Sequence, residues 1–134
     1  MAVVSILQTP STKLFLGGDS GYDTIFAEIG NKYESPFDLA ILECGQYSPY
    51  WKYIHMMPEE TVRAGLDLRA EKILPVHWAK FSLSLNDWDD SIKRVTAEAS
   101  KKKRICLFNS SNDWRRGGFK WPNEIFQDGG RSIT

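Results

Sequence analysis

Three residues in this sequence carry side chains suited to metal binding or acid–base chemistry: Asp19, His55 and His77. Asp19 stands in the glycine-rich segment 17–21, and His77 directly follows the apolar segment 73–76. A carboxylate and an imidazole that converge are suitable ligands for zinc or a similar divalent ion. If both segments follow strands of one α/β sheet, their side chains would meet at the edge where such sheets bind ligands.

Each of these residues also has an alternative, structural role. An aspartate in a glycine-rich turn commonly caps a helix or forms an Asx-turn. A histidine after a strand often makes a hydrogen bond at the rim of the core, and His55 could simply stack on Trp51 or Tyr53. The glycine-rich segment matches neither the Walker A pattern nor the dinucleotide fingerprint, so it is weak evidence for phosphate binding.

Hydrophobic periodicity predicts an alternation of strands and helices that would position these residues. Strands are predicted at 2–7, 13–16, 37–44, 72–76 and 104–108, and helices at 22–29, 58–69 and 86–99. The first two strands should form a hairpin through the turn at 9–12. The later alternation predicts an α/β fold with a mixed sheet.

Two of the predicted helices have a clear apolar face. The helix that begins at Pro58 would bury Val62, Leu66 and Leu68. The last helix, which Asn86 would cap, has one apolar face that consists of Trp88, Ile92, Val95 and Ala99.

Composition limits the classes of function. The chain has 134 residues and no formal net charge, so no overall field favours nucleic acid or an anionic membrane. Residues 101–134 are basic on balance, but no nucleic-acid-binding module accompanies them, so nucleic acid is not an expected partner. No signal peptide or transmembrane segment is visible, and Cys44 and Cys106 are expected to be buried reduced thiols. The expected location is the cytoplasm.

Four motifs occur in an order that is typical of one family. They are GGDSGY at 17–22, PFDLAILECGQY at 36–47, HMMPEE at 55–60 and LPVHWAKFSL at 74–83. Together they resemble the C-terminal half of metallo-β-lactamase-fold hydrolases of the ascorbate-6-phosphate lactonase and N-acyl-phosphatidylethanolamine phospholipase D group. The resemblance implies half of an αββα sandwich in residues 1–108, with a mixed sheet and helices on one face. Residues 109–134 would form an irregular basic tail.

The resemblance also implies a role for each candidate residue. Asp19 matches an aspartate that bridges two metal ions, and His77 matches a terminal ligand of one metal. His55 matches a histidine near the substrate in the phospholipase-like members and is therefore a candidate catalytic residue. The implied reaction is hydrolysis of an ester, lactone or phosphodiester by metal-activated water, with zinc as the first candidate and manganese or iron as alternatives.

The sequence also departs from the family pattern. It lacks the HxHxDH motif that supplies the family's first metal ligands, and it contains only two histidines. Alone, the chain is expected to be inactive or nearly so, and it could lack bound metal, because a missing N-terminal half would supply the other ligands. The apolar sheet face that such a half would cover predicts self-association, most simply as a dimer. A non-catalytic half-domain that self-associates through this face is the alternative function.

Overall fold

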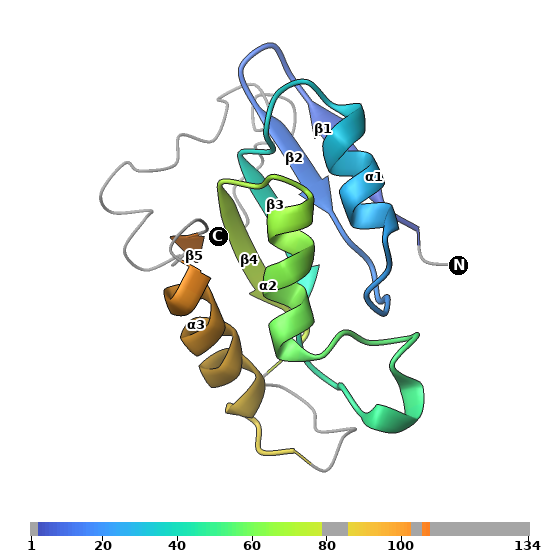
Figure 1. Cartoon of the computed structure of the whole chain (residues 1–134), viewed down its shortest axis with the longest axis vertical. Coiled ribbons are helices and arrows are strands. Elements are labelled where there is room, and N and C mark those ends of the chain that lie inside the picture. Colours follow the sequence, from blue (N-terminus) through green and yellow to red (C-terminus); the bar gives the residue numbers. More distant parts are fainter. Residues whose placement is uncertain (1–2, 79–85, 103–105, 108–134) are drawn as a thin grey trace, which may run out of the picture.

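The computed structural model describes residues 3–78, 86–102 and 106–107, which form a five-stranded sheet and three α-helices (Figure 1). The strands are β1 (Ser5–Gln8), β2 (Lys13–Leu16), β3 (Leu39–Glu43), β4 (Lys72–Val76) and β5 (Cys106–Leu107). The helices are α1 (Ile25–Lys32), α2 (Pro58–Asp67) and α3 (Asp90–Lys102), with a 3₁₀ turn η1 (Pro49–Trp51) before α2.

The strands lie in the sheet in their chain order. β1 pairs antiparallel with β2, as the predicted hairpin requires, and β2 to β5 are parallel neighbours. Each parallel connection described in full crosses over through a helix, which is the usual way to join parallel strands. The prediction of a mixed α/β sheet is therefore confirmed.

Helix α2 begins where the sequence predicts. Pro58 occupies its first turn, where a missing N–H costs nothing. Glu59 and Glu60 follow in the first turn and interact favourably with the helix dipole. The Glu60 carboxylate also accepts the backbone N–H of Met57 at 2.9 Å, which satisfies a donor at the helix start. The loop that precedes α2 is thus anchored at the point where it enters the helix.

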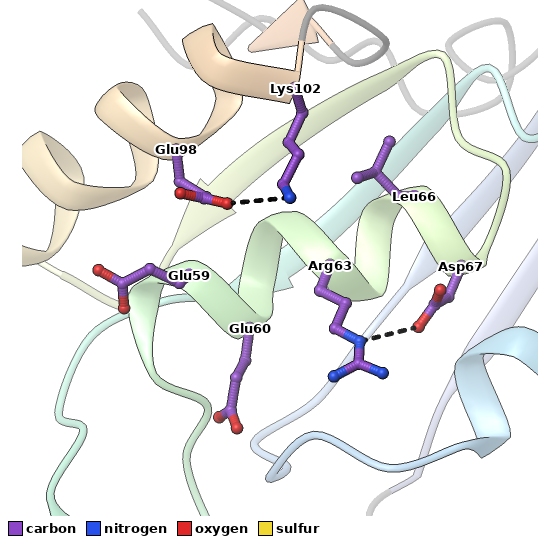
Figure 2. Close-up of a pocket in the computed structure, with 7 residues that line it drawn as sticks. All are labelled: Glu59, Glu60, Arg63, Leu66, Asp67, Glu98 and Lys102. Carbon is purple, nitrogen blue, oxygen red and sulfur yellow. Dashed lines mark ion pairs between the residues drawn. The ribbon is translucent and has the colours of Figure 1, made fainter.

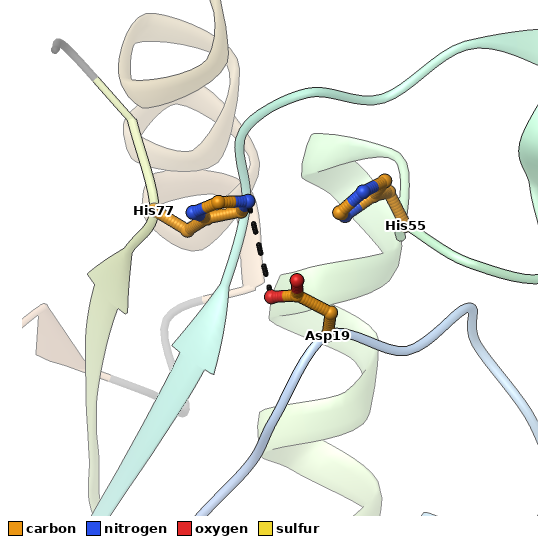
Figure 3. Close-up of side chains that lie close together, drawn as sticks. All are labelled: Asp19, His55 and His77. Atoms are coloured by element: carbon orange, nitrogen blue, oxygen red, sulfur yellow. Dashed lines mark ion pairs between the residues drawn. The ribbon is translucent and has the colours of Figure 1, made fainter. Parts of the chain in front are cut away.

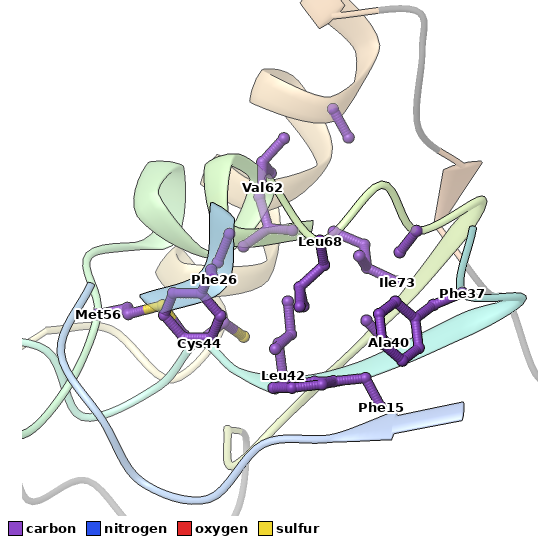
Figure 4. Packing of buried hydrophobic residues seen from close by; sticks show 14 residues of the cluster. Phe15, Phe26, Phe37, Ala40, Leu42, Cys44, Met56, Val62, Leu68 and Ile73 are labelled. Carbon is purple, nitrogen blue, oxygen red and sulfur yellow. The ribbon is translucent and has the colours of Figure 1, made fainter. Parts of the chain in front are cut away.

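All three helices contribute to one core on the same face of the sheet, as predicted (Figure 1). Burying each large apolar side chain stabilises the fold by about 1.5–3 kcal/mol. The buried residues of this cluster include Phe15, Phe26, Phe37, Ala40, Leu42, Cys44, Met56, Val62, Leu68, Ile73 and Val95 (Figure 4). The expected burial of Cys44 is confirmed.

The opposite face of the sheet carries a second, smaller apolar cluster. Leu14 and Leu39 are buried there, and the partly buried side chains packed against them are Leu16, Ile41 and Leu74. Exposed large apolar side chains are found around β1, at Val3, Val4 and Leu7, and in the segment 50–54, at Tyr50, Tyr53 and Ile54. The sheet face expected to be apolar is therefore only partly exposed, because Leu14 and Leu39 on it are buried.

The structure corrects several local predictions. In the last helix Val95 and Ala99 are buried, but Trp88 is 67% exposed because α3 begins two residues after it. The Asn86 side-chain amide donates to the Tyr47 carbonyl at 3.1 Å, four residues before α3 begins. Leu66 is only partly buried, whereas Val62 and Leu68 are fully buried. The predictions for the Cys106 side chain and for the tail at 109–134 lie outside the described residues.

Candidate metal centre

Asp19, His55 and His77 come from three different connections at one edge of the sheet. Asp19 lies in the loop after β2, His55 in the loop between β3 and α2, and His77 directly after β4. Because β2, β3 and β4 are parallel, their carboxyl ends share this edge. Figure 3 shows the three side chains pointing toward one another.

The donor atoms of these three side chains all lie within 4.8 Å of one another. His77 Nε2 is 3.8 Å from Asp19 Oδ1, and the stacked rings of His55 and His77 have centroids 5.5 Å apart. The Asp19–His77 separation is too long for a direct hydrogen bond, but it suits two ligands of one ion that each bind it at about 2.0–2.2 Å. The convergence of Asp19 and His77 predicted from the sequence is therefore observed, and His55 joins them.

The backbone around His77 is held in an uncommon conformation. His77 has φ of 67°, in the left-handed region that few non-glycine residues adopt. The Cys44 N–H donates to the Val76 carbonyl at 3.0 Å, and a Cβ atom on Gly45 would lie 1.9 Å from the His77 carbonyl oxygen. Only glycine allows this close approach. The ends of β3 and β4 are thereby held together, which fixes the backbone from which the His77 side chain projects.

The loop that carries His55 is tied to the loop that carries Asp19. The Gly21 N–H donates to the Tyr53 carbonyl at 3.0 Å, and a Cβ atom on Gly21 would lie 2.1 Å from the Lys52 carbonyl oxygen. The indole N–H of Trp51 donates to the Gln46 carbonyl at 2.6 Å, which closes the aromatic loop on itself. A loop that precedes β3 in the sequence and the loop that follows it are therefore held together at the site.

A fourth polar residue, Glu43, lies behind His55, and sequence reasoning did not select it. Glu43 is the last residue of β3 and is only 1% exposed. Its Oε1 accepts the Met56 N–H at 2.6 Å, and its Oε2 lies 3.4 Å from His55 Nδ1. The signal was present in the sequence as one acidic residue inside the otherwise apolar segment 37–44.

Burial sets the protonation behaviour of this pair. It raises the pKa of Glu43 to about 8, against the lowering effect of the Met56 hydrogen bond and with a further rise from the negative charge of Asp19. Burial also lowers the pKa of His55, while the Asp19 charge opposes that shift and His77 adds to it. In the metal-free chain both groups therefore favour their neutral forms.

The donor set fits a divalent cation. One carboxylate and two imidazoles, converging within 4.8 Å, are the ligand types that zinc prefers, and manganese or iron also accept them. Asp19 and His77 have side-chain exposures of 57% and 41%, so an ion and a further ligand can reach them. His55, at 13%, lies deeper.

A small apolar hollow adjoins the site. It has a volume of about 230 Å³ and is lined by Gln46, Trp51, Ile54 and His55. A second hollow, on the helix side, is lined by charged residues of α2 and α3 and contains ion pairs from Arg63 to Asp67 and from Lys102 to Glu98 (Figure 2). Only the first hollow lies beside a candidate site residue.

Comparison with known proteins identifies the family. The model of the Beta-lactamase superfamily domain matches residues 3–78, which is more than half of the chain. The chain belongs to this family. The match includes Asp19, His55 and His77 and confirms the resemblance noted from the four motifs.

Relatives with assigned names are similar to between about half and nine-tenths of the chain. Outer membrane protein RomA of Klebsiella pneumoniae is 55% identical over 69 residues, which are 52% of each chain. The mitochondrial N-acyl-phosphatidylethanolamine-hydrolyzing phospholipase D of Saccharomyces cerevisiae is 42% identical over 53% of this chain and 16% of its own length. The "Probable L-ascorbate-6-phosphate lactonase UlaG" of Escherichia coli is 30% identical over 90% of this chain and 33% of its own.

Solved structures agree on the fold. Igni18, a metallo hydrolase of Ignicoccus hospitalis, superimposes with a TM-score of 0.56 at 20% identity, over 77% of this chain and 40% of its own. The chain thus spans about half, or less, of the length of the relatives it matches. Within the described residues, no helix is both long and apolar enough to cross a bilayer.

Proposed function

We propose that this chain is part of a metal-dependent hydrolase that cleaves a phosphodiester, lactone or other ester, with Asp19 and His77 as metal ligands. The supporting observation is the convergence of one carboxylate and two imidazoles within 4.8 Å at the ligand-binding edge of the sheet. Zinc is the first candidate metal, and manganese or iron are alternatives. The names of the yeast and Escherichia coli relatives support these substrate classes.

The three residues have different roles in this proposal. A divalent metal bound there would lower the pKa of water and stabilise negative charge that develops on a substrate oxygen. Asp19 and His77 hold the ion, and His55 faces the substrate as the catalytic residue, beside the apolar hollow that contacts the substrate's apolar part. The deeper position of His55 shields it from water, which suits a group that gives or takes a proton.

The chain alone supplies too few ligands for the two-metal site that the family resemblance implies. It contains two histidines and no HxHxDH motif. We therefore propose that the remaining ligands come from a segment equivalent to the family's N-terminal half, on the same or another polypeptide, and that this chain alone does not turn over substrate.

Metal titration of the purified chain tests the ligand assignment. Isothermal titration with Zn²⁺ should show binding that Asp19→Asn and His77→Asn each weaken by about tenfold or more, because each removes a charge or a donor. Asparagine suits position 77 because it tolerates the left-handed backbone found there. Asp87→Asn, which changes an exposed aspartate outside the site, is the matched control. Equal binding by all four proteins would remove the proposed centre. If His55→Ala weakens Zn²⁺ binding as much as Asp19→Asn and His77→Asn do, His55 is also a ligand.

Turnover is tested separately with bis(4-nitrophenyl) phosphate and a chromogenic lactone. The chain with Zn²⁺ or Mn²⁺ should release no product above the metal blank. Addition of a polypeptide that carries the HxHxDH half should produce activity that depends on Asp19. Turnover by the chain alone would contradict the proposed need for the other half, and activity that survives Asp19→Asn would contradict the role of Asp19.

A second candidate, a non-catalytic half-domain that self-associates, is favoured by one observation. Leu16, Ile41 and Leu74 remain partly exposed on the sheet face opposite the helices, and Val3, Val4 and Leu7 are exposed around β1. Sedimentation at micromolar concentration should show a dimer, which Ile41→Asp weakens; a stable monomer would end this candidate. The cytoplasmic location stays a prediction that cell fractionation can check.

A further inference from the structure

Glu43 is a buried acid with one oxygen engaged and one free. Its Oε1 accepts the backbone N–H of Met56 at 2.6 Å. Its Oε2 is fully buried and has no hydrogen-bond partner among the described residues. Buried carboxylate oxygens in native proteins are nearly always paired, so an unpaired one calls for a functional explanation.

The group that faces this oxygen is equally unpaired. His55 Nδ1 is buried, lacks a hydrogen-bond partner within the described part of the chain, and lies 3.4 Å from Glu43 Oε2. This distance is a few tenths of an ångström longer than an ordinary N–H···O bond. Hydrogen bonds of functional groups are often long in ligand-free structures and shorten when the site is filled.

The backbone around the pair leaves Glu43 little freedom. The Thr61 hydroxyl donates to the Glu43 carbonyl at 2.9 Å, which ties the end of β3 to α2. Met56, whose N–H holds Oε1, is the residue after His55 and is itself 1% exposed. One carboxylate therefore contacts both the main chain and the side chain of the same two-residue segment.

We infer that Glu43 is a positioning residue, whose ionised carboxylate accepts the Nδ1–H of His55 so that the Nε2 lone pair of His55 faces Asp19 and His77. A carboxylate behind an imidazole fixes both the orientation of the ring and the nitrogen that carries the proton. With Nδ1 engaged by Glu43, Nε2 is the ring nitrogen left to act in the site. The inference rests on the proposed function for the use of His55, but its test needs neither metal nor substrate.

Glu43→Gln separates this role from mere packing because it should reverse the tautomer. The amide oxygen of the glutamine must take the place of Oε1, because the amide NH₂ group cannot accept the Met56 N–H. The NH₂ group then faces His55 and donates to Nδ1. The proton of the neutral imidazole is left on Nε2, which abolishes the lone pair directed at the site.

Glu60→Gln is the matched control. Glu60 also accepts a backbone N–H, from Met57, the residue next to Met56, but it contacts neither histidine in the described structure. The chain has only two histidines, so long-range ¹H–¹⁵N spectra of an untagged sample give two imidazole patterns, and His77→Asn assigns them. The spectra are recorded at about pH 9.5, where His55 is neutral and Glu43 is ionised.

The expected result is an Nδ1–H tautomer at His55 in the wild type and in Glu60→Gln, and an Nε2–H tautomer in Glu43→Gln. An Nε2–H tautomer at His55 in the wild type would overturn the inference, even if Glu43→Gln does not fold. An unchanged Nδ1–H tautomer in a folded Glu43→Gln would also overturn it. Absence of Zn²⁺ binding would affect the proposed function alone, since the tautomer is measured without metal.

Discussion

Two clusters of charged side chains in this chain differ in how completely they are satisfied. Between α2 and α3, Arg94 donates from Nε and Nη2 to Glu59 at 2.7 and 2.6 Å, lies 3.6 Å from Asp90 and stacks over the Tyr47 ring. The Tyr47 hydroxyl donates to Asp90. We name these four residues the helix clamp. In the metal centre, by contrast, the closest approach between Asp19 and His77 is 3.8 Å.

This difference separates a structural network from a functional one. Each charge of the helix clamp has a partner of opposite sign, and such satisfied bidentate pairs hold two elements in one geometry. The metal centre combines exposed donors that do not bond to each other with two buried atoms that lack partners in the described residues. Unsatisfied buried polar groups are rare in folded proteins, and departures of this kind are expected at functional sites.

The largest expected effect comes from Gly45→Ala, which disturbs the backbone that supports the metal centre. The added methyl group would lie 1.9 Å from the His77 carbonyl oxygen, so β3 and β4 must separate. We expect a loss of about 3 kcal/mol or more in the free energy of unfolding, measured by urea denaturation. Gly18→Ala, whose methyl group meets nothing closer than 3.0 Å, should cost clearly less. Equal losses would contradict the lock between the strand ends.

The second effect is a pH dependence that belongs to the metal centre. The folded-state pKa of Glu43 is about 8, above its ordinary 4.5, so the folded metal-free chain keeps a proton that the unfolded chain releases. The contribution of Glu43 to stability should therefore be fully present below 4.5, decline as pH rises toward 8, and then level off, with a slope of at most about 1.4 kcal/mol per pH unit. Glu43→Gln should remove this decline. A wild-type curve that runs parallel to that of Glu43→Gln between pH 5 and 8 would contradict the prediction.

Arg94→Met should break the helix clamp without affecting the metal centre. We expect a loss of about 1–2 kcal/mol, since the Arg94 and Glu59 side chains are only partly buried, at 34% and 42% exposed. Arg94 also lowers the pKa of Glu59, so the stability it contributes is present above 4.5 and is lost as pH falls through the lowered pKa. The variant should therefore be less sensitive to acid, while Zn²⁺ titration should match the wild type.

The smallest effect on stability is expected for Asp19→Asn. Asp19 is largely exposed, and its charge raises the pKa of buried Glu43, so the substitution removes a repulsion as well as a contact. We expect a change within about 0.5 kcal/mol in the free energy of unfolding, beside the loss of Zn²⁺ affinity. A loss comparable to that of Arg94→Met would show that Asp19 serves the fold and would erase the contrast between the two clusters.

Much of the fold followed from local sequence signals. The strands Lys13–Leu16 and Lys72–Val76 were predicted with their observed bounds, and Pro58 with its two acids fixed the start of α2. The convergence of Asp19 and His77 followed from one rule, that loops after parallel strands share an edge. The prediction that Trp88 lies on the apolar face of the last helix was wrong, because α3 begins only at Asp90.

Other features depend on tertiary contacts that spacing does not encode. The helix clamp joins Tyr47, Glu59 and Arg94, which only the docking of α3 on α2 brings together. Glu43 went unselected because an apolar strand accommodates one acid only if a specific partner waits for it, and that partner, His55, lies in an irregular loop. The position of His55 came from resemblance to a family, since its own neighbours in sequence suggest only aromatic stacking.

The chain order of the strands has a consequence for folding. The metal-binding residues Asp19 and His77 are far apart in the sequence and are separated in the sheet by the whole of β3. They can meet only after both crossovers have closed, and closing long loops is a slow, entropically costly event. A cation that binds both residues would therefore recognise only chains whose β4 has docked. In a refolding experiment, the time at which Zn²⁺ affinity appears would therefore report when β4 docks.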